Sequence, residues 1–340
     1  MTSRRLLALV VLALLAGGCS QPAKDSSKAS DSGGAFPVGL VFDIGGRGDK
    51  SFNDSAYNGL TRAQQELGIR FSTLETSEGS DREAQLRQLA SGDSKLIFGV
   101  GFLFTDDVRN LAKEFPDKKF ACIDYTVTPG DSLPPNLVAL KFREEEGSFL
   151  VGALAALLTK TNKVGFVGGM EIPLIRKFQA GYVAGAKAAN PNVQVLIKYA
   201  GTTGAAFKDP TKGKELALAE YHQGADIIFH AAGSTGLGVF EAGRELKKLA
   251  IGVDSDQYDE APGVVLTSMV KHVEVAVFNT IRDMQAGRFA AGIKVFGLAE
   301  DGVGWVYDAR NRPLIPEAVK ARVDSLRAEI VAGRIVAPSQ

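Results

Sequence analysis

The sequence predicts an α/β protein of two pseudo-symmetric lobes, each a parallel sheet flanked by helices, with a ligand cleft between the lobes. From Phe36 onward, short apolar runs alternate with amphipathic segments, which is the pattern of parallel sheets covered by helices. The chain has 340 residues, more than one hydrophobic core normally organises. The order of elements also recurs, because residues 38–41 (VGLV) align with residues 164–167 (VGFV) at an offset of 126.

The first residues predict a lipoprotein signal rather than part of the fold. Residues 6–16 are eleven apolar residues after a basic start; they are too few for the roughly 20 that span a bilayer, but they suit a secretory signal. Cys19 follows small residues and resembles the lipidated cysteine of a bacterial lipobox; the alternative is an ordinary cleaved signal with an incidental cysteine. We predict a signal peptide over residues 1–18, then a lipidated cysteine and a flexible tether over residues 19–35, which contain no large apolar side chain.

The composition excludes several classes of partner. Lys and Arg together number 39, as do Asp and Glu, so no excess charge favours a nucleic-acid polymer or an anionic membrane surface. Apart from Cys19 the chain has one cysteine, Cys122, so no internal disulfide is expected.

Within the first lobe, the periodicity predicts alternating strands and helices. Strands are expected at residues 37–42, 94–101 and 118–125, and helices at residues 53–68 and 105–116. An apolar helix over residues 147–158 follows three glutamates, residues 144–146, which are expected to face solvent and complement the helix dipole.

The second lobe repeats this order. Strands are expected at residues 162–169, 193–200, 225–233 and 249–256, and helices at residues 176–189, 212–224 and 238–248. A C-terminal helix is expected to start at Pro316. We predict that lobe 1 contains residues 36–143 and 255–290, and that lobe 2 contains residues 144–254 and 291–340.

Acidic and small residues follow the predicted strands. In open parallel sheets, ligands bind outside the carboxyl ends of the strands. Asp43, Asp124 and Asp254 stand there as acceptors for hydroxyl or ring N–H groups, and Gly233 permits close approach to the backbone. The alternative for the three aspartates is helix capping or turn formation.

The glycine-rich loop at residues 45–51 (GGRGDKS) is not a phosphate-binding loop. Asp49 separates Gly48 from Lys50, whereas a Walker A loop has Gly directly before Lys. The Arg-Gly-Asp tripeptide leaves a surface adhesin as an alternative, which predicts that the tripeptide is exposed. Ser51 and Asp54 fit a capping box, so Ser51 is expected to be mainly structural, with a ligand contact as a further role.

No catalytic, metal or cofactor site is expected. The three histidines, His222, His230 and His272, lack ligand-like spacing, and no nucleophile elbow is present. A binding protein is therefore favoured over an enzyme, and an enzyme that uses Asp254 as a base is kept as a remote alternative.

Two aromatic residues are candidates for a stacking clamp. Phe52 and Phe178 are separated by the same 126 residues as the two aligned strands, so they occupy equivalent places near the first helix of each lobe. If the lobes face each other, the rings can hold a planar group between them. The alternative is that both are core residues. Lys271, after an apolar strand, is a hydrogen-bond donor to the ligand or a partner for an acid.

Motifs along almost the whole mature chain resemble the basic membrane protein (BMP) lipoproteins. They include DIGGRGDKSFNDSAYNGL, FREEEGSFLVGALAAL, YHQGADIIFHAAGSTGLGVFEA, IGVDSDQ and VLTSMVKHVEVAV. Members of this family are substrate-binding proteins of ABC importers, capture purine nucleosides and have a type I periplasmic-binding fold. Many members carry a second acid or an apolar residue where Arg47 and Gly48 stand here.

The resemblance implies a role for each candidate residue. The base would stack between Phe52 and Phe178, while Asp254 and Lys271 would hold the ribose. The remaining contacts to base or ribose would come from Asp43, Asn53, Asp124 and the backbone near Gly233. The expected partners are a purine nucleoside, an ABC permease and, through Cys19, a bacterial membrane, with the globular body outside the cytoplasmic membrane and monomeric. A nucleobase or a sugar remains the alternative ligand, and a nucleoside hydrolase or phosphorylase using Asp254 as a base is the remote enzyme alternative.

Overall fold

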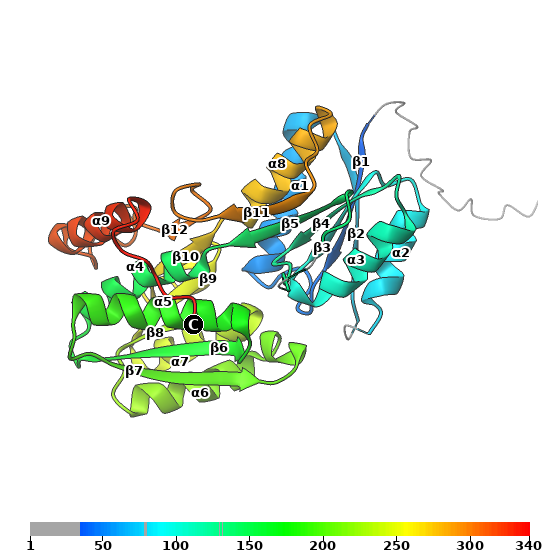
Figure 1. Cartoon of the computed structure of the whole chain (residues 1–340). Helices are drawn as coiled ribbons and strands as arrows, with labels where there is room; N and C mark the ends of the chain where they lie inside the picture. The colour runs from blue at the N-terminus through cyan, green and yellow to red at the C-terminus, as the bar shows by residue number, and fades with distance from the viewer. Residues whose placement is uncertain (1–34, 78–79, 129, 131) are drawn as a thin grey trace, which may run out of the picture. The chain divides into compact units, whose positions relative to one another are not determined.

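The computed structural model describes residues 35–77, 80–128, 130 and 132–340. The predicted signal peptide, Cys19 and all but the last residue of the tether lie outside this part. Residues 35–340 form one compact unit that contains two sheets of six strands each (Figure 1). None of the helices in the described part of the chain combines the length and the apolar character that crossing a membrane requires.

Sheet A, the sheet of lobe 1, has the strand order β11-β5-β4-β3-β1-β2, with every pairing parallel. Its strands are β1 (Pro37–Phe42), β2 (Arg70–Glu75), β3 (Leu96–Val100), β4 (Lys119–Ile123), β5 (Leu137–Phe142) and β11 (Gly292–Phe296). Its helices are α1 (Phe52–Leu67), α2 (Arg82–Ser91), α3 (Thr105–Glu114) and α8 (Val273–Gln285), and α1 and α8 lie side by side (Figure 1). β1 and β3 are buried along their whole length, as expected of central strands covered on both faces.

Sheet B, the sheet of lobe 2, has the order β12-β10-β9-β8-β6-β7. Its strands are β6 (Lys163–Met170), β7 (Gln194–Gly201), β8 (Ile227–Ala231), β9 (Leu249–Asp254), β10 (Val265–Lys271) and β12 (Val303–Trp305), of which only β12 is antiparallel to its neighbour. Its helices are α4 (Glu144–Leu158), α5 (Pro173–Ala189), α6 (Pro210–His222), α7 (Gly236–Leu246) and α9 (Glu317–Val331), with 3-10 turns η2 (Gly204–Phe207), η3 (Gly233–Thr235) and η4 (Tyr258–Glu260). Among the described residues of lobe 1 there is one such turn, η1 (Phe102–Phe104).

The internal repeat is real at the level of topology. Strands β1 to β5 have the order 5-4-3-1-2, and β6 to β10 have the equivalent order 10-9-8-6-7. The equivalent residues Asp124 and Asp254, at the ends of β4 and β9, share a left-handed backbone with φ of 60° and 63°, which few non-glycine residues adopt. The two-lobe parallel-sheet prediction is therefore confirmed.

The predicted lobe boundaries need correction. β10 pairs with β9 in sheet B, so residues 255–271 belong to lobe 2, whereas residues 291–296 belong to lobe 1 because β11 pairs with β5. The chain crosses between lobes after β5, after β10 and after β11. Short apolar runs do not reveal which sheet they join, since that depends on pairing partners distant in the sequence. At the C-terminus, α9 begins one residue after Pro316.

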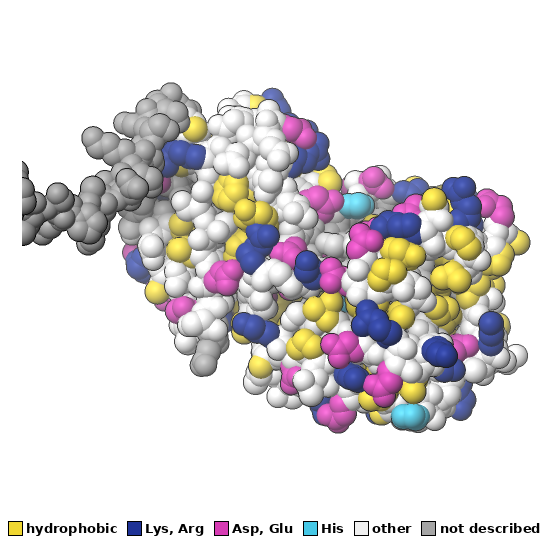
Figure 2. All heavy atoms as spheres, turned by 180° about the vertical axis from the view of Figure 1, so that it is seen from behind, with side chains coloured by type: hydrophobic (Ala, Val, Ile, Leu, Met, Phe, Trp, Pro, Cys, Tyr) yellow, Lys and Arg dark blue, Asp and Glu magenta, His cyan; other side chains and the backbone are white. Residues whose placement is uncertain are grey.

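α4 and α5 pack unusually closely, which explains their glycines. A Cβ added at Gly152 would lie 2.1 Å from the Tyr182 carbonyl oxygen, and one at Gly185 would lie 1.9 Å from the Phe149 carbonyl oxygen. Most of α4 is buried, in keeping with its nearly continuous apolar sequence. On the face shown in Figure 2, basic and acidic side chains are interspersed rather than gathered by sign.

Candidate functional site

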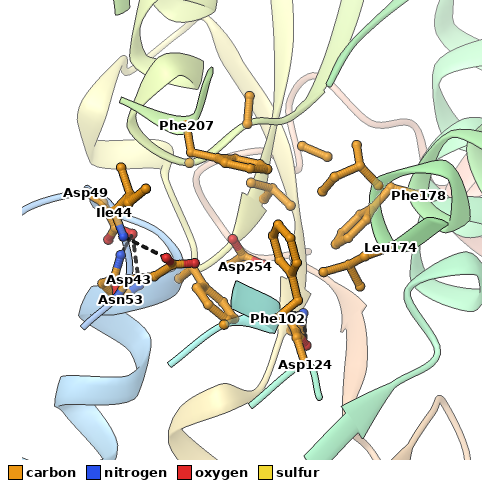
Figure 3. A pocket seen from close by; sticks show the side chains of 18 residues that line it. Asp43, Ile44, Asp49, Asn53, Phe102, Asp124, Leu174, Phe178, Phe207 and Asp254 are labelled. Atoms are coloured by element: carbon orange, nitrogen blue, oxygen red, sulfur yellow. Dashed lines mark hydrogen bonds and ion pairs between the residues drawn. The ribbon is translucent and has the colours of Figure 1, made fainter. Parts of the chain in front are cut away.

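The carboxyl ends of the strands in both sheets line one cleft between the lobes (Figure 3). The lining residues surround about 550 Å³ that protein atoms do not fill, a figure that includes open solvent, but only about 60 Å³ of it has room for the centres of water-sized molecules. The cleft is therefore narrow in this structure. Eight of the nine residues predicted to bind ligand line it: Asp43, Phe52, Asn53, Asp124, Phe178, Gly233, Asp254 and Lys271.

Ser51 is the exception. It is fully buried behind the cleft wall, where its hydroxyl donates to Asp254 Oδ2 at 2.6 Å. It makes no side-chain cap on α1, so the capping-box prediction for Ser51 and Asp54 is wrong. The Ser51 side chain instead joins a lobe 1 helix to a lobe 2 strand end.

Asp49 caps α1 in place of Ser51. Its carboxylate accepts the backbone N–H groups of Ser51, Asn53 and Asp54 and the side-chain amide of Asn53, at 2.8–3.1 Å. Asp49 is only 3% exposed, so an exposed Arg-Gly-Asp tripeptide, which the adhesin alternative requires, is not present. Sequence pattern did not separate Asp49 from Ser51 because both precede the same helix.

Asp54 shapes the loop before α1. Its carboxylate accepts the backbone N–H groups of Gly48 and Lys50 and pairs with Arg47 Nε at 2.9 Å. The Arg47 guanidinium also lies 3.3 Å from the centroid of the Tyr57 ring. Asp54 in the first turn of α1 and Arg47 in the loop thus hold the glycine-rich loop against α1.

Asn53 orients the first strand end. Its side-chain oxygen accepts the Asp43 backbone N–H at 2.9 Å, and the Asp43 carboxylate accepts the N–H of Ile44 at 2.8 Å (Figure 3). Burial raises the pKa of Asp43 to about 7 despite that hydrogen bond. Asp43 therefore presents a carboxyl to the cleft that changes charge near neutral pH.

Lys271 is a buried cation held between acids. Its Nζ donates to both oxygens of Asp124 at 2.7 Å and lies 3.0 Å from Glu144 Oε1. Burial opposes the charged form of Lys271, but the neighbouring carboxylates outweigh burial and raise its pKa. Burial raises the pKa of Asp124 in spite of the Lys271 charge.

Glu144 was missed as a member of this cluster. It is fully buried rather than solvent-facing, and burial is outweighed by Lys271 and Lys177, which lower its pKa. In the sequence, Glu144 looked like an acid that complements the dipole at the start of an apolar helix. Its contact with Lys271 arises only because the chain crosses from β5 into lobe 2 at this point.

Asp254 faces Asp43 and Asp124 from the other lobe. Burial raises the pKa of Asp254 to about 7, against the effects of Lys271 and the Ser51 hydroxyl. The cleft therefore offers several acceptors, while the three N–H groups of Lys271 are directed at Asp124 and Glu144. An excess of acceptors suits an uncharged ligand with hydroxyl and N–H groups.

Phe52 and Phe178 both reach the cleft. Their ring centroids lie 5.0 and 5.8 Å from Lys271 Nζ. Phe178 is only 3% exposed and packs on Phe229 with centroids 6.5 Å apart, so it is a core residue as well as a wall of the cleft. Phe52 is the first residue of α1, whereas Phe178 is the sixth of α5.

Two further aromatic residues were missed. Phe102 of lobe 1 and Phe207 of lobe 2 line the cleft, with ring centroids 6.5 Å apart at an interplanar angle of 66° (Figure 3). Phe102 follows the β3 end, a signal that strand-end reasoning could have used; Phe207 lies in the short turn η2, which periodicity does not reveal. Gly233 has φ of +55° and lies against the Phe207 carbonyl.

The described residues contain no group of His, Cys, Asp and Glu side chains arranged to hold a metal ion. His230 is fully buried, and burial lowers its pKa to about 4, so it is a neutral interior residue. Cys122 is buried, which raises the pKa of its thiol.

Comparisons with known proteins agree with this architecture. The family described as "ABC transporter substrate-binding protein PnrA-like" (Bmp) matches residues 36–340. The chain is 36% identical to the "CD4+ T-cell-stimulating antigen" of Listeria innocua, covering 98% of this chain and 96% of the relative. It is 38% identical to "Basic membrane protein A" of Borreliella burgdorferi, covering 89% and 87%.

A solved structure of an ABC transporter solute-binding protein from Aeropyrum pernix superposes with a TM-score of 0.81 at 30% identity, covering 90% of this chain and 94% of that one. The fold is therefore the type I periplasmic-binding fold, and the chain is a binding protein rather than an enzyme. It belongs to the Bmp family of ABC transporter substrate-binding proteins.

Proposed function

We propose that this protein captures a purine nucleoside in the cleft and delivers it to the permease of an ABC importer. The observation that carries the proposal is the combination of aromatic rings and aspartates from both lobes around one space. A planar base can stack on Phe52 and the rings that face it from lobe 2, and stacking contributes about 1–3 kcal/mol per base.

The polar groups favour a nucleoside over a bare sugar or a free base. Asp254, Asp124 and Lys271 converge at one part of the cleft and can bind the two ribose hydroxyls. Asp43, whose backbone N–H donates to the Asn53 side-chain oxygen, can accept from base N–H groups. A free base would not use the acceptors that Asp124 and Asp254 offer to hydroxyl groups, and a sugar would leave the aromatic rings without a partner.

We further propose that Cys19 carries the lipid and that residues 19–35 tether a monomeric globular body to the outside of the cytoplasmic membrane. Mass spectrometry of the membrane-bound protein tests this: a diacylglyceryl mass on a chain beginning at Cys19 is expected. A chain that begins elsewhere, or a bare cysteine, would contradict the anchor.

Isothermal calorimetry on protein lacking residues 1–35 tests the ligand. Saturable binding is expected for at least one of guanosine, adenosine and inosine, and binding of ribose and free purines is expected to be at least tenfold weaker. No saturable binding to any purine compound would refute the proposal.

Phe52→Leu separates stacking from hydrophobic burial. The variant keeps an apolar side chain but loses the ring, so nucleoside affinity should fall about tenfold, equivalent to ~1.4 kcal/mol. Phe289→Leu is the matched control, because Phe289 is a partly exposed lobe 1 aromatic outside the cleft. Equal losses in the two variants would exclude stacking on Phe52.

A further inference from the structure

A small group of polar residues joins the lobes beside the cleft. Ser255 Oγ donates to the Ser51 carbonyl oxygen at 3.0 Å, and Gln257 Nε2 donates to the Lys50 carbonyl oxygen at 3.0 Å. With the Ser51–Asp254 hydrogen bond, these contacts bind the amino end of α1 in lobe 1 to the segment after β9 in lobe 2. We call Lys50, Ser51, Ser255 and Gln257 the interlobe clasp.

The lobe 2 side of the clasp is built into the interior of that lobe. Gln257 is 1% exposed; its Oε1 accepts the Val253 N–H at 2.8 Å and pairs with His230 Nε2 at 3.0 Å. Its backbone N–H donates to Ser268 Oγ. The Gln257 side-chain amide is thus fixed in direction before it meets lobe 1, so little side-chain entropy is lost on forming the interlobe bond.

The clasp residues are close in sequence to residues that line the cleft, but they do not line it themselves. Phe52 directly follows Ser51, and Asp254 directly precedes Ser255. Neither Ser255 nor Gln257 is among the cleft-lining residues. Formation of the clasp therefore fixes the position of one candidate residue from each lobe.

We propose that Ser255 and Gln257 are positioning residues: they form their hydrogen bonds to α1 only when the lobes close, and they thereby couple closure to the arrangement of Phe52 and Asp254 around the ligand. A group that stabilises only the closed state slows ligand escape, because release requires opening. The inference depends on two-lobe closure; only its ligand-release test rests on the proposed purine.

Ser255→Ala is the cleanest test. It removes a donor to one carbonyl and leaves the interior contacts of Gln257 intact, whereas Gln257→Met would also orphan Val253 N and His230. Stopped-flow measurement should show guanosine dissociating about fivefold faster from Ser255→Ala, the factor typical of one lost hydrogen bond, with little change in association. Tyr221→Phe is the control, since it loses a hydroxyl-to-carbonyl bond of 2.8 Å inside lobe 2.

A second measurement needs no ligand. Ile44 of lobe 1 meets η2 of lobe 2, and a Cβ placed at Gly204 would lie 3.5 Å from Ile44 Cγ1. The pair Ile44→Cys and Gly204→Cys should therefore form a disulfide with oxidised glutathione at a rate that follows the closed population. Adding Ser255→Ala should slow this reaction about fivefold.

The outcomes separate the two proposals. If no purine compound binds, the proposed ligand is refuted. The cross-linking rate still tests the role of the clasp in closure, because that measurement uses no ligand. The clasp is refuted if Ser255→Ala changes neither dissociation nor cross-linking by more than twofold, or if Tyr221→Phe changes them equally.

Discussion

Glu220 gives the sharpest prediction about stability, because it is an acid buried without compensation. It lies on α6 at 0% exposure, and neither carboxyl oxygen has a hydrogen-bond partner among the described residues. Gly165 of β6 makes room for it, since a Cβ there would lie 2.2 Å from Glu220 Oε2. Burial raises the pKa of Glu220 from 4.5 to about 9, with Lys198 opposing weakly.

The carboxyl is therefore protonated in the folded protein at pH 7 and ionised in the unfolded chain. Each pH unit between the two pKa values costs the folded state ~1.4 kcal/mol, so at pH 7 the cost is roughly 3 kcal/mol. A folded-state pKa raised above the unfolded value means that full stability is present below pH 4.5 and is lost progressively as pH rises toward about 9.

Urea unfolding of wild type and Glu220→Gln at pH 5, 6, 7 and 8 measures this. Glutamine does not titrate, whereas wild type loses stability as pH rises. The free energy of unfolding of the variant minus that of wild type should therefore increase by ~1.4 kcal/mol per pH unit. Glu215→Gln, at a 67% exposed side chain on the same helix, is the control and should run parallel to wild type. Parallel pH dependence of wild type and Glu220→Gln would refute the reasoning.

Two further predictions concern close packing and buried charge. Lys271→Met should lower the free energy of unfolding by ~3–5 kcal/mol, because it leaves buried Asp124 without a cation and Glu144 with Lys177 alone. Adding Asp124→Asn should recover part of the loss in urea unfolding, and no recovery would contradict the pairing. Gly185→Ala should cost ~3 kcal/mol because its Cβ would meet the Phe149 backbone, whereas Gly92→Ala, with 3.5 Å of clearance, should change stability by less than about 0.5 kcal/mol by the same assay.

The alternation of apolar strands and amphipathic helices predicted the layers of the fold correctly. This worked because the burial of a strand is visible in its own sequence. β1 and β3 are apolar throughout because helices cover both of their faces. The lobe boundaries after Asp254 were placed wrongly, because the choice between sheets A and B for β10 and β11 depends on strand neighbours far along the chain.

At the site, strand-end reasoning placed Asp43, Asp124 and Asp254 at one cleft because parallel strands end at one edge of a sheet. It did not find Phe207, which lies in a turn without periodicity, or Glu144, whose position resembles ordinary capping. It also assigned the cap of α1 to Ser51, when Asp49 takes that role.

The sequence by itself therefore determined the layers, the two-fold repeat and the acidic strand ends, because each follows from spacing along one strand or helix. Only the tertiary structure decided which distant groups meet: Lys271 with Glu144 within lobe 2 and, across the lobes, Lys271 with Asp124, Ser51 with Asp254, and the Gln257 side chain with the Lys50 backbone carbonyl. These pairs join residues separated by 127 to 207 positions, and their contact energies exist only after the chain has folded into two lobes whose strand ends meet at the cleft.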